Sequence, residues 1–483
     1  MRLSQLLNRI EYESSVASLD EIEIKGIACD SKAVSDGYLF IAIAGTKSDG
    51  HIFASEAAKR GAVAVVLQKD IDLCARVAKI FVKDTREALA VIASEFYGRP
   101  SENMTCVGIT GTNGKTTILY LIDSVISAAG HKAGIIGTIN YRIGERVIPA
   151  INTTPGPAEL FSFMSEMRQC SIDYAVMEVS SHSLVQKRVK GIDFSVAVFT
   201  NLTGDHLDYH GTLEKYFDAK AMLFEELGGH SCAVINIDDP WGRILLKRAK
   251  GKILTYGVTP EADFSAGEIE LSLNGTVFAV KTPDGKVKVA SSLIGLHNVY
   301  NITASIAAGI ALGFSLEMIK SGVEAVSAIP GRLEAINAGQ SFKVFVDYAH
   351  TDDALYNVLS ALKPLIKNRI ILVFGCGGER DRSKRPRMGK VASEFADLLI
   401  ITSDNPRGED PKAIASEIVS GVKTRNYIII LDRLQAIREA LSSAQENDCV
   451  LIAGKGHEPY QVLKDTTVAF DDRKTARDIL CAL

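Results

Sequence analysis

The residues with the clearest chemical potential lie in "VGITGTNGKTT", residues 107–117. An apolar run leads into Gly111 and Gly114, where missing side chains let backbone N–H groups surround phosphate oxygens. Lys115 would reach the terminal phosphates, and the Thr116 hydroxyl would reach a Mg²⁺ ion. Position 109 is isoleucine, so the stretch is a variant of the strict G-x-x-x-x-G-K-[ST] pattern. It predicts a nucleotide phosphate loop, and the alternative is a glycine-rich turn that binds no ligand.

Acidic and imidazole side chains follow in two places. Glu178 ends the apolar run of "AVMEVSSH", and a lone carboxylate beside phosphate oxygens suits Mg²⁺, although a solvated acid is the alternative. "GDHLDYH" then gathers four such side chains within six residues, which predicts a second metal site or an acid–base site. A transition-metal site is the competing interpretation, but one cluster without distant ligands seldom forms a zinc site. The four residues are Asp205, His206, Asp208 and His210, of which His210 alone is more typical of a structural or surface histidine.

Two further stretches are harder to interpret from residue types. Lys220, in "YFDAKAMLF", has the spacing of a helix lysine with a solvated ammonium group. "TSDNPRGED", residues 402–410, ends an apolar run with an acid, an amide, a proline and an arginine. Pro406 restricts the turn, and Arg407 could bind a carboxylate through two hydrogen bonds. The alternative is a capping loop with a surface arginine.

Composition limits the classes of protein. A chain of 483 residues is long enough for about three domains, and 47% apolar with 23% charged residues is typical of a globular protein. The net charge of -4 argues against a general nucleic-acid binder. The eight cysteines are scattered without metal-ligand spacing, and no stretch approaches the roughly 20 apolar residues of a membrane span. We expect a monomer in the cytoplasm that binds no nucleic acid.

The elements that must position these residues fall into three sections. Residues 1–100 hold short apolar runs and predict a small N-terminal α/β substrate domain. Residues 101–330 alternate apolar runs with helical stretches, which predicts a central P-loop ATPase domain with a parallel sheet and a hairpin-like insert. Residues 331–483 repeat this rhythm and predict a C-terminal Rossmann-like α/β domain. Ligands bind at the carboxyl ends of such strands, where the candidate residues lie.

Several motifs occur in an order that resembles a known family. "GTNGKTT", "EVSSH", "TNLTGDHLDYHGT", "GLHNVYN", "GRLE" and "VDYAHTDDAL" resemble the ATP-dependent Mur ligases of peptidoglycan synthesis and cover all three sections. "DSKAVSDGYLF", "NTTP", "GCGGERDRSKRP" and "DNPR" resemble the branch that adds the third residue of the stem peptide. The arginine of "DNPR" is typical of members that use meso-diaminopimelate. The chain departs from the family at Asp352, where proline is common.

The resemblance implies a residue-by-residue site. Lys115, His206 and Lys220 would be catalytic, and Lys220 would react with CO₂ to become a carbamate, which reverses the interpretation from its spacing. Mg²⁺ would be held by Thr116, Glu178, His206 and the carbamate of Lys220. The ATP contacts would be Gly111, Thr112, Asn113, Gly114, Lys115, Thr116, Thr117, Asn301, Arg332 and Asp347.

The implied substrates are UDP-N-acetylmuramoyl-L-alanyl-D-glutamate and meso-diaminopimelate. The first would contact Ser31, Thr46, Lys47, Ser48, Asn152, Thr153, Thr154, Ser180, Gln186 and Arg188. The second would contact Arg380, Asp404, Asn405, Pro406, Arg407, Gly454 and Glu458. A guanidinium would favour diaminopimelate over L-lysine, because lysine lacks the second carboxylate.

These residues predict an ATP-dependent ligase that forms an acyl phosphate and then an amide. Water would hydrolyse that intermediate, so we expect the C-terminal domain to close over the site, with Gly331 as a hinge. The same ligase using L-lysine, another Mur ligase and a folylpolyglutamate synthetase remain alternatives. A P-loop NTPase switch and a purely structural α/β protein are alternatives from other classes.

Overall fold

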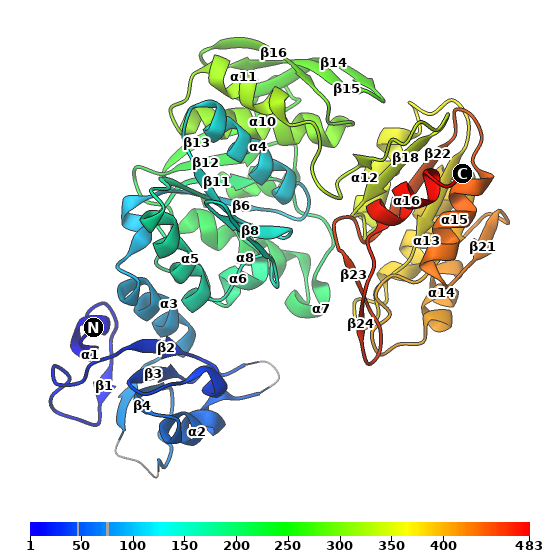
Figure 1. Cartoon of the computed structure of the whole chain (residues 1–483). Coiled ribbons are helices and arrows are strands. Elements are labelled where there is room, and N and C mark those ends of the chain that lie inside the picture. Colours follow the sequence, from blue (N-terminus) through cyan, green and yellow to red (C-terminus); the bar gives the residue numbers. More distant parts are fainter. Residues whose placement is uncertain (46–47, 74–76) are drawn as a thin grey trace. The chain divides into compact units, whose positions relative to one another are not determined.

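The computed structural model describes residues 1–45, 48–73 and 77–483, and Figure 1 traces the chain. Its contacts divide it into two compact units. Unit 1 comprises Met1–Thr110, His131–Ala197 and Met222–Ser231, and unit 2 comprises Gly111–Gly130, Val198–Ala221 and Cys232–Leu483. Within the described residues, no helix is long and apolar enough to cross a membrane. The described cysteines carry free thiols.

Unit 1 begins with a five-stranded sheet in the order β1-β5-β4-β3-β2, parallel except for β1. The apolar runs "YLFI" and "AVAVVL" form β3 and β4, which are buried because side chains pack on both sheet faces. The elements are α1 (Leu3–Leu6), β1 (Glu13–Ser14), β2 (Gly26–Ala28), η1 (Ser31–Ala33), β3 (Tyr38–Ile41), η2 (Gly50–Phe53), α2 (Ala54–Lys59), β4 (Ala62–Leu67), β5 (Ala78–Phe81), α3 (Thr85–Phe96) and η3 (Pro100–Asn103).

Unit 1 continues with strands in the order β11-β6-β10-β7-β8-β9. The strands β6, β10 and β7 run parallel, and Glu178 pairs with Ile109 in register, so Glu178 lies at the same sheet edge as the start of the phosphate loop. The elements are β6 (Thr105–Thr110), β7 (Ala133–Ile136), β8 (Asn140–Ile143), β9 (Arg146–Pro149), α5 (Pro157–Gln169), β10 (Tyr174–Glu178), α6 (Ser181–Val185) and β11 (Phe194–Phe199), whose last two residues belong to unit 2.

Unit 2 opens with the helix after the phosphate loop and with strands in the order β16-β15-β14-β13-β12. The predicted hairpin-like insert is confirmed, because β14, β15 and β16 pair in antiparallel fashion. The dipeptides "NG" and "DG" lie where one strand turns into the next. The elements are α4 (Lys115–Ala128), α7 (Leu207–His210), α8 (Leu213–Glu225, shared with unit 1), β12 (Cys232–Asn236), α9 (Pro240–Leu245), β13 (Lys252–Gly257), β14 (Phe264–Ser272), β15 (Gly275–Thr282), β16 (Gly285–Ser291), α10 (Leu296–Ala311) and α11 (Leu316–Ala325).

The C-terminal part of unit 2 holds a six-stranded sheet in the order β17-β18-β22-β19-β20-β21, parallel except for β17. The elements are β17 (Glu334–Ala335), β18 (Lys343–Asp347), α12 (Asp352–Leu362), β19 (Ile370–Phe374), α13 (Lys384–Phe395), β20 (Leu398–Ile401), α14 (Pro411–Val419), β21 (Tyr427–Ile429), α15 (Arg433–Ser443), β22 (Cys449–Ala453), the hairpin strands β23 (Tyr460–Val462) and β24 (Thr467–Ala469), and α16 (Asp472–Leu480).

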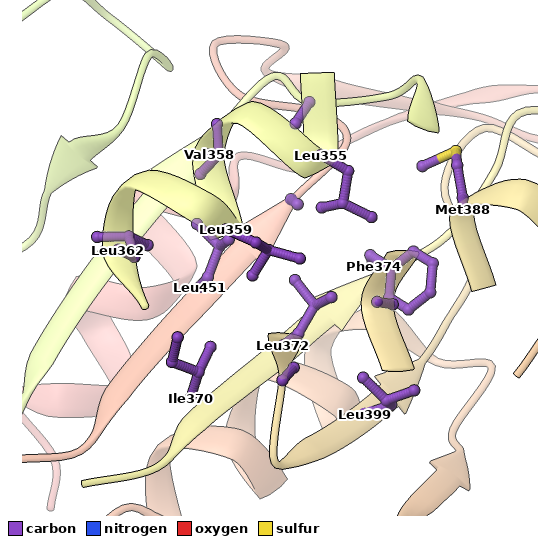
Figure 2. Packing of buried hydrophobic residues seen from close by; sticks show 14 of the residues in the cluster. Leu355, Val358, Leu359, Leu362, Ile370, Leu372, Phe374, Met388, Leu399 and Leu451 are labelled. Carbon is purple, nitrogen blue, oxygen red and sulfur yellow. The ribbon is translucent and has the colours of Figure 1, made fainter. Parts of the chain in front are cut away.

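Two apolar layers sandwich this C-terminal sheet. Helices α12, α13 and α14 pack on one face, where Leu359, Leu372 and Leu451 are fully buried (Figure 2). Helices α15 and α16 pack on the other face through residues such as Ile437 and Ala476 (Figure 1). Because both faces are covered, the strands are near-continuous apolar runs, and only their ends can carry polar residues. The candidate amino-acid-binding loops follow two such ends, β20 and β22.

Candidate active site

The phosphate loop lies between β6 and α4. Gly111 and Gly114 adopt positive φ angles of 142° and 91°, which L side chains rarely adopt. A Cβ atom at Gly111 would lie 1.8 Å from Thr200 Oγ1, and one at Gly114 would lie 2.4 Å from Asn301 Oδ1. Both positions therefore require glycine for backbone conformation and for space.

Neighbouring strand ends hold the loop in place. The Thr112 N–H donates to the Asn201 carbonyl at 2.8 Å, and the Asn113 N–H donates to Asn201 Oδ1 at 3.0 Å. The Thr200 hydroxyl donates to the Asn113 carbonyl at 2.6 Å. Lys115 Nζ folds back over the loop and donates to the Gly111 carbonyl at 2.9 Å. The shape of the loop is thus held by hydrogen bonds within the chain, and a lysine ammonium group lies over it.

Lys220 is buried against this loop. The residue is 1% exposed, its Nζ donates to the Gly111 carbonyl at 2.8 Å, and the same atom lies 4.4 Å from the centre of the Tyr216 ring. The solvated lysine expected from spacing alone is therefore wrong. Burial lowers the pKa of Lys220 well below its ordinary value and repulsion from Lys115 lowers it further, although Asp205 opposes the shift.

The acid–imidazole cluster spans the start of α7, with Asp205 and His206 before the helix and Asp208 and His210 within it. His206 has a φ of 55°, its N–H donates to Asp205 Oδ1 at 2.9 Å, and its Nε2 is 3.4 Å from Asp205 Oδ2. Burial raises the pKa of Asp205, but His206, His350 and Lys384 outweigh burial and lower it. His210 is buried, as expected of a structural histidine. Within the described residues, no group of three or more His, Cys, Asp or Glu side chains could hold a metal ion, so the transition-metal interpretation gains no support.

A cavity of about 660 Å³ in unit 2 adjoins the phosphate loop. Its walls include Gly114 and Thr116 of the loop together with Asn301, Arg332 and Asp347, so the structure brings together the predicted nucleotide residues from distant parts of the chain. The Arg332 guanidinium donates from Nη2 to Thr116 Oγ1 at 3.0 Å. It also lies 4.8 Å from the centre of the Tyr348 ring.

Asp347 is fixed by backbone donors. Its carboxylate accepts hydrogen bonds from the N–H groups of Leu333 at 2.6 Å and Ala349 at 2.7 Å. Burial raises the pKa of Asp347, although Arg332 and both N–H groups oppose the shift. The orientation of this carboxylate in the cavity is therefore set by its own loop and by the segment that carries Arg332.

Sequence reasoning missed several residues of the cavity wall. His297 is partly buried in the cavity wall, and desolvation lowers its pKa to about 4, which favours a neutral imidazole. Asp353 accepts hydrogen bonds from Asn113 Nδ2 at 2.6 Å and Thr203 Oγ1 at 3.0 Å. His297 belongs to the "GLHNVYN" stretch and Asp353 to the "VDYAHTDDAL" stretch. Both stretches were singled out in the sequence, but these two residues were assigned no role there.

In unit 1, Glu178 is buried, so the alternative of a solvated acid is excluded. Its two carboxylate oxygens accept from the Thr138 N–H at 2.8 Å and the Thr138 hydroxyl at 2.9 Å. The Thr154 hydroxyl donates to the Glu178 carbonyl at 2.8 Å and accepts from the Ser180 N–H at 3.1 Å. Arg188 Nη1 donates to the Thr154 carbonyl at 2.6 Å.

The remaining candidates for the sugar-nucleotide site are distributed over unit 1. Arg188 Nε and Nη2 donate to Gln186 Oε1 at 3.1 and 2.7 Å, and Thr153 Oγ1 lies 3.1 Å from Thr138 Oγ1. The Asn152 carbonyl accepts from the Tyr141 hydroxyl at 2.6 Å. Ser31 and Ser48 belong to the N-terminal part, where the Ser31 hydroxyl donates to Glu56. Thr46 and Lys47 lie outside the described residues.

The loops after β20 and β22 join in a buried polar cluster. Asn405 Nδ2 donates to Glu458 Oε2 at 2.9 Å. Lys455 Nζ donates to Asn405 Oδ1 at 3.1 Å and to Glu458 Oε2 at 3.0 Å. A Cβ atom at Gly454 would lie 2.7 Å from Asp404 Oδ2. Lys455 was not predicted, because a lysine between two glycines has no distinctive spacing.

Arg407 lies at the rim of this cluster with a φ of 51°. Its Nη1 donates to the Gly378 carbonyl at 2.7 Å, so the "DNPR" turn contacts the "GCGGER" loop, where Arg380 is exposed. Arg385 has a fully buried side chain that binds both oxygens of Glu409, at 2.9 Å each, and the Gly377 carbonyl at 3.1 Å. Its guanidinium lowers the pKa of Glu409 to about 2.

Comparison with known proteins matches three family descriptions in succession. Residues 23–97 match "Mur ligase family, catalytic domain", residues 109–309 match "Mur ligase middle domain", and residues 331–456 match "Mur ligase, glutamate ligase domain". Together they show the three-domain α/β fold of these ligases.

Similar proteins extend over the whole chain. UDP-N-acetylmuramoyl-L-alanyl-D-glutamate--2,6-diaminopimelate ligases from Syntrophomonas wolfei and Solibacter usitatus are 46% and 47% identical and align with 99% of this chain and 99% and 98% of their own. A solved structure of a protein with the same name is 34% identical with a TM-score of 0.72 and covers 100% of this chain and 99% of that one. The chain belongs to the Mur ligase family.

Proposed function

We propose that this chain is an ATP-dependent ligase that joins meso-diaminopimelate to the D-glutamate carboxylate of UDP-N-acetylmuramoyl-L-alanyl-D-glutamate in peptidoglycan synthesis. Similar proteins of nearly equal length carry the name of this activity. The geometric observation that carries the proposal is Lys220, which is buried against the phosphate loop. Simple nucleotide hydrolysis leaves such a lysine unexplained, whereas a carbamate there would serve an acyl-phosphate ligase.

The ATP phosphates would lie on Gly111–Thr117, and the rest of the nucleotide would occupy the cavity beside Asn301, Arg332 and Asp347. Support comes from the preformed loop and from the cavity volume of about 660 Å³, which is in the usual range for small-molecule sites. MurF ligase from Thermotoga maritima, which is 20% identical over 95% of this chain and 97% of its own, was solved in complex with ADP. Its TM-score of 0.64 supports the shared fold alone.

The donor atoms present suit Mg²⁺. Thr116 and Glu178 offer oxygen atoms, which hard cations prefer, and the Glu178 carboxylate is oriented by Thr138. Mg²⁺ would neutralise negative charge on the phosphate oxygens when bound. We place Thr116, Glu178, His206 and modified Lys220 around it.

Lys220 as an ammonium cation does not fit a cation site, but its carbamate does. The lowered pKa favours the neutral amine, whose nitrogen attacks the carbon of CO₂, forms an N–C bond and loses a proton to water. The product is an anion that can bind a cation. Burial would protect this carbamate from hydrolysis.

The two acceptor substrates would use the groups already described. Ser31, Thr46 to Ser48, Asn152 to Thr154, Ser180, Gln186 and Arg188 would bind the sugar nucleotide. Arg380, Asp404 to Arg407, Gly454 and Glu458 would bind diaminopimelate, with Arg407 on its distal carboxylate and Glu458 near its distal amino group. A guanidinium and a carboxylate are complementary to that zwitterionic end.

The reaction would proceed in two steps. The substrate carboxylate attacks the γ-phosphate of ATP. This attack forms an acyl phosphate and releases ADP. Lys115 shields the phosphate charge that repels the attacking carboxylate, so its contribution is electrostatic. The neutral amino group of diaminopimelate then attacks the acyl carbon, the C–O bond to phosphate breaks, and the nitrogen loses a proton to a base such as water.

At a larger scale, we propose domains at residues 1–100, 101–330 and 331–483 in a monomer. The C-terminal domain would close over the intermediate and exclude water. We place the protein in the cytoplasm, because ATP and UDP-activated precursors are available there.

The test that separates a ligase from an NTPase switch measures ADP and amide product together. Purified protein is given ATP, Mg²⁺, the sugar-nucleotide dipeptide and meso-diaminopimelate, and each acceptor is omitted in turn. We expect ADP and amide to form in equal amounts only when both acceptors are present. ADP release that is independent of the acceptors and yields no amide would contradict the proposal and favour the switch.

A further inference from the structure

We propose that Arg433 is a positioning residue that holds the two diaminopimelate-binding loops at a fixed spacing. The inference rests on the proposed function for its substrate, but its geometry is independent of it. Arg433 is the first residue of α15, and its side chain is completely buried. It lies outside the substrate-binding residues, so its influence on the reaction is indirect.

The charge of Arg433 is neutralised by a single partner. Its Nε donates to Asp472 Oδ1 at 2.8 Å, and its Nη2 donates to Asp472 Oδ2 at 2.7 Å. Asp472 begins α16 and is also completely buried. Two buried charges are tolerated when they are paired and hydrogen-bonded. The pair with Asp472 uses two N–H donors of the Arg433 guanidinium, and the other N–H groups can bind elsewhere.

Two further donors of the guanidinium bind backbone carbonyls. Nη1 donates to the Ser403 carbonyl at 3.3 Å, and Nη2 also donates to the Ala453 carbonyl at 3.0 Å. Ser403 immediately precedes Asp404, and Ala453 immediately precedes Gly454. Arg433 therefore contacts the last backbone group before each of the two loops that carry the proposed diaminopimelate ligands.

The strands before these loops are not neighbours. The sheet order places β19 between β20 and β22, so no ladder hydrogen bond fixes the distance between their ends. The planar guanidinium spans this gap with donors in a rigid fork, which a lysine ammonium cannot reproduce. Arg433 thus supplies a direct link that the sheet itself lacks.

The polar cluster of Asn405, Lys455 and Glu458 depends on the distance between the loops after β20 and β22. Asn405 and Glu458 come from different loops and share a 2.9 Å hydrogen bond, and Lys455 bonds to both side chains. A relative shift of the loops by about 1 Å would disturb these contacts. Displacements of this size can reduce a catalytic rate by about a hundredfold.

The test uses Arg433→Lys in the full chain, with the KM for each of the three substrates as the readout. We expect the KM for meso-diaminopimelate to rise by about tenfold or more, with the KM values for ATP and the sugar nucleotide changed by less than about twofold. The matched control is Arg369→Lys. Arg369 also binds an aspartate through two donors, Asp448, and a backbone carbonyl, Ser443, but it immediately precedes β19, at the amino ends of the strands.

Hydrogen exchange gives a readout that does not depend on ligation. In Arg433→Lys, the amides of residues 404–407 and 454–458 should exchange faster than in the unchanged chain, whereas Arg369→Lys should leave them unaltered. If the unchanged chain forms no amide product, the proposed function fails, and exchange still decides whether Arg433 holds the loops.

Three results would overturn the inference. These are an unchanged KM for diaminopimelate in Arg433→Lys, an equal rise for all three substrates, and unaltered exchange in both loops. If Arg433→Lys fails to bind a non-hydrolysable ATP analogue, Asp472→Asn replaces it with the same expected rise. Failure of both variants to bind the analogue would make the pair a folding determinant and contradict the specific role.

Discussion

At the scale of single residues, Lys220 shows how burial changes the chemistry of a common side chain. An ammonium group in water does not react with CO₂, but desolvation lowers the pKa of Lys220 and favours the nucleophilic amine. The same burial places this amine against the phosphate loop. The proposed modification and the position of Lys220 would therefore both follow from one packing arrangement.

We predict that Lys220→Ala reduces the ligation rate by about a hundredfold or more, the loss expected when a preorganised charge is removed. Lys215→Ala is the matched control, because Lys215 lies on the same helix and is exposed. In the unchanged chain at fixed acidic pH, added bicarbonate should partly restore activity, since acid protonates the amine and favours CO₂ loss. Normal ligation by Lys220→Ala would remove this residue from the mechanism.

In the proposed function, Arg407 discriminates between amino acids. Arg407→Ala should raise the KM for meso-diaminopimelate by about tenfold to a hundredfold, because a charge-assisted hydrogen bond is lost. Binding of an ATP analogue, measured by calorimetry, should be unchanged. Arg425→Ala, an exposed arginine of the same C-terminal part, serves as the control. Unchanged use of diaminopimelate by Arg407→Ala would restore the interpretation of a surface arginine.

Residue types indicated part of this site. Lys115, Glu178 and Arg407 lie at or after the ends of apolar strands, and this placement made them candidates. The roles proposed for Glu178 and Arg407 depend on the family resemblance as well. The burial of Arg433 and Arg385 was not predictable, because "LDRLQAI" and "SKRPRM" are typical of exposed helix starts. Their buried partners lie 24 to 39 residues further along the chain, and only tertiary packing brings such groups together.

At the scale of elements, the phosphate loop depends on close contact between two helices. Gly114 immediately precedes α4, and a side chain there would collide with Asn301 of α10. The turn and helix were predictable from glycine and lysine spacing. The contact with Asn301 was not, because it depends on how two helices pack.

We predict that Gly114→Ala weakens binding of an ATP analogue by at least about tenfold. The left-handed backbone costs roughly 1–2 kcal/mol for a residue with a Cβ, and the clash with Asn301 moves the loop further. Gly130→Ala is the control, since Gly130 has a φ of 82° with no atom near the added Cβ. It should lose stability but bind the analogue normally. Equal affinity of the two variants, measured by calorimetry, would contradict the packing argument.

The strands were the most predictable elements. The runs "FKVFVDYAH", "RIILVFGCGG" and "DCVLIAGKG" became β18, β19 and β22, because strands covered on both faces must be apolar throughout. Strand order was not predictable, since the sequence does not state that β22 lies between β18 and β19. The spacing between binding loops, and with it the role of Arg433, follows from that order.

At the scale of the whole molecule, the proposed two-step reaction would require water to be excluded while the acyl phosphate exists. Gly331 stands at the proposed domain boundary with a φ of 66°, and a Cβ there would lie 2.1 Å from the His457 backbone nitrogen. A residue in such a conformation can absorb a change in backbone angles when the domain moves.

We predict that small-angle scattering detects a decrease in the radius of gyration when an ATP analogue and the sugar nucleotide bind together. Gly331→Ala should reduce this change and the ligation rate by about tenfold. Gly339→Ala, at a φ of 93° with open space around it, should do neither. An unchanged radius in the unmodified chain would contradict domain closure.

The measurement that tests the central claim most directly is ligation by the purified chain with UDP-N-acetylmuramoyl-L-alanyl-D-glutamate and an equimolar mixture of meso-diaminopimelate and L-lysine. The product is identified by its mass. The account predicts that the diaminopimelate adduct forms almost exclusively, because only that substrate has a second, distal carboxylate for Arg407 to bind. A lysine adduct in equal or greater amount would contradict the proposed role of the "DNPR" loop, and the absence of both adducts would contradict the proposed reaction.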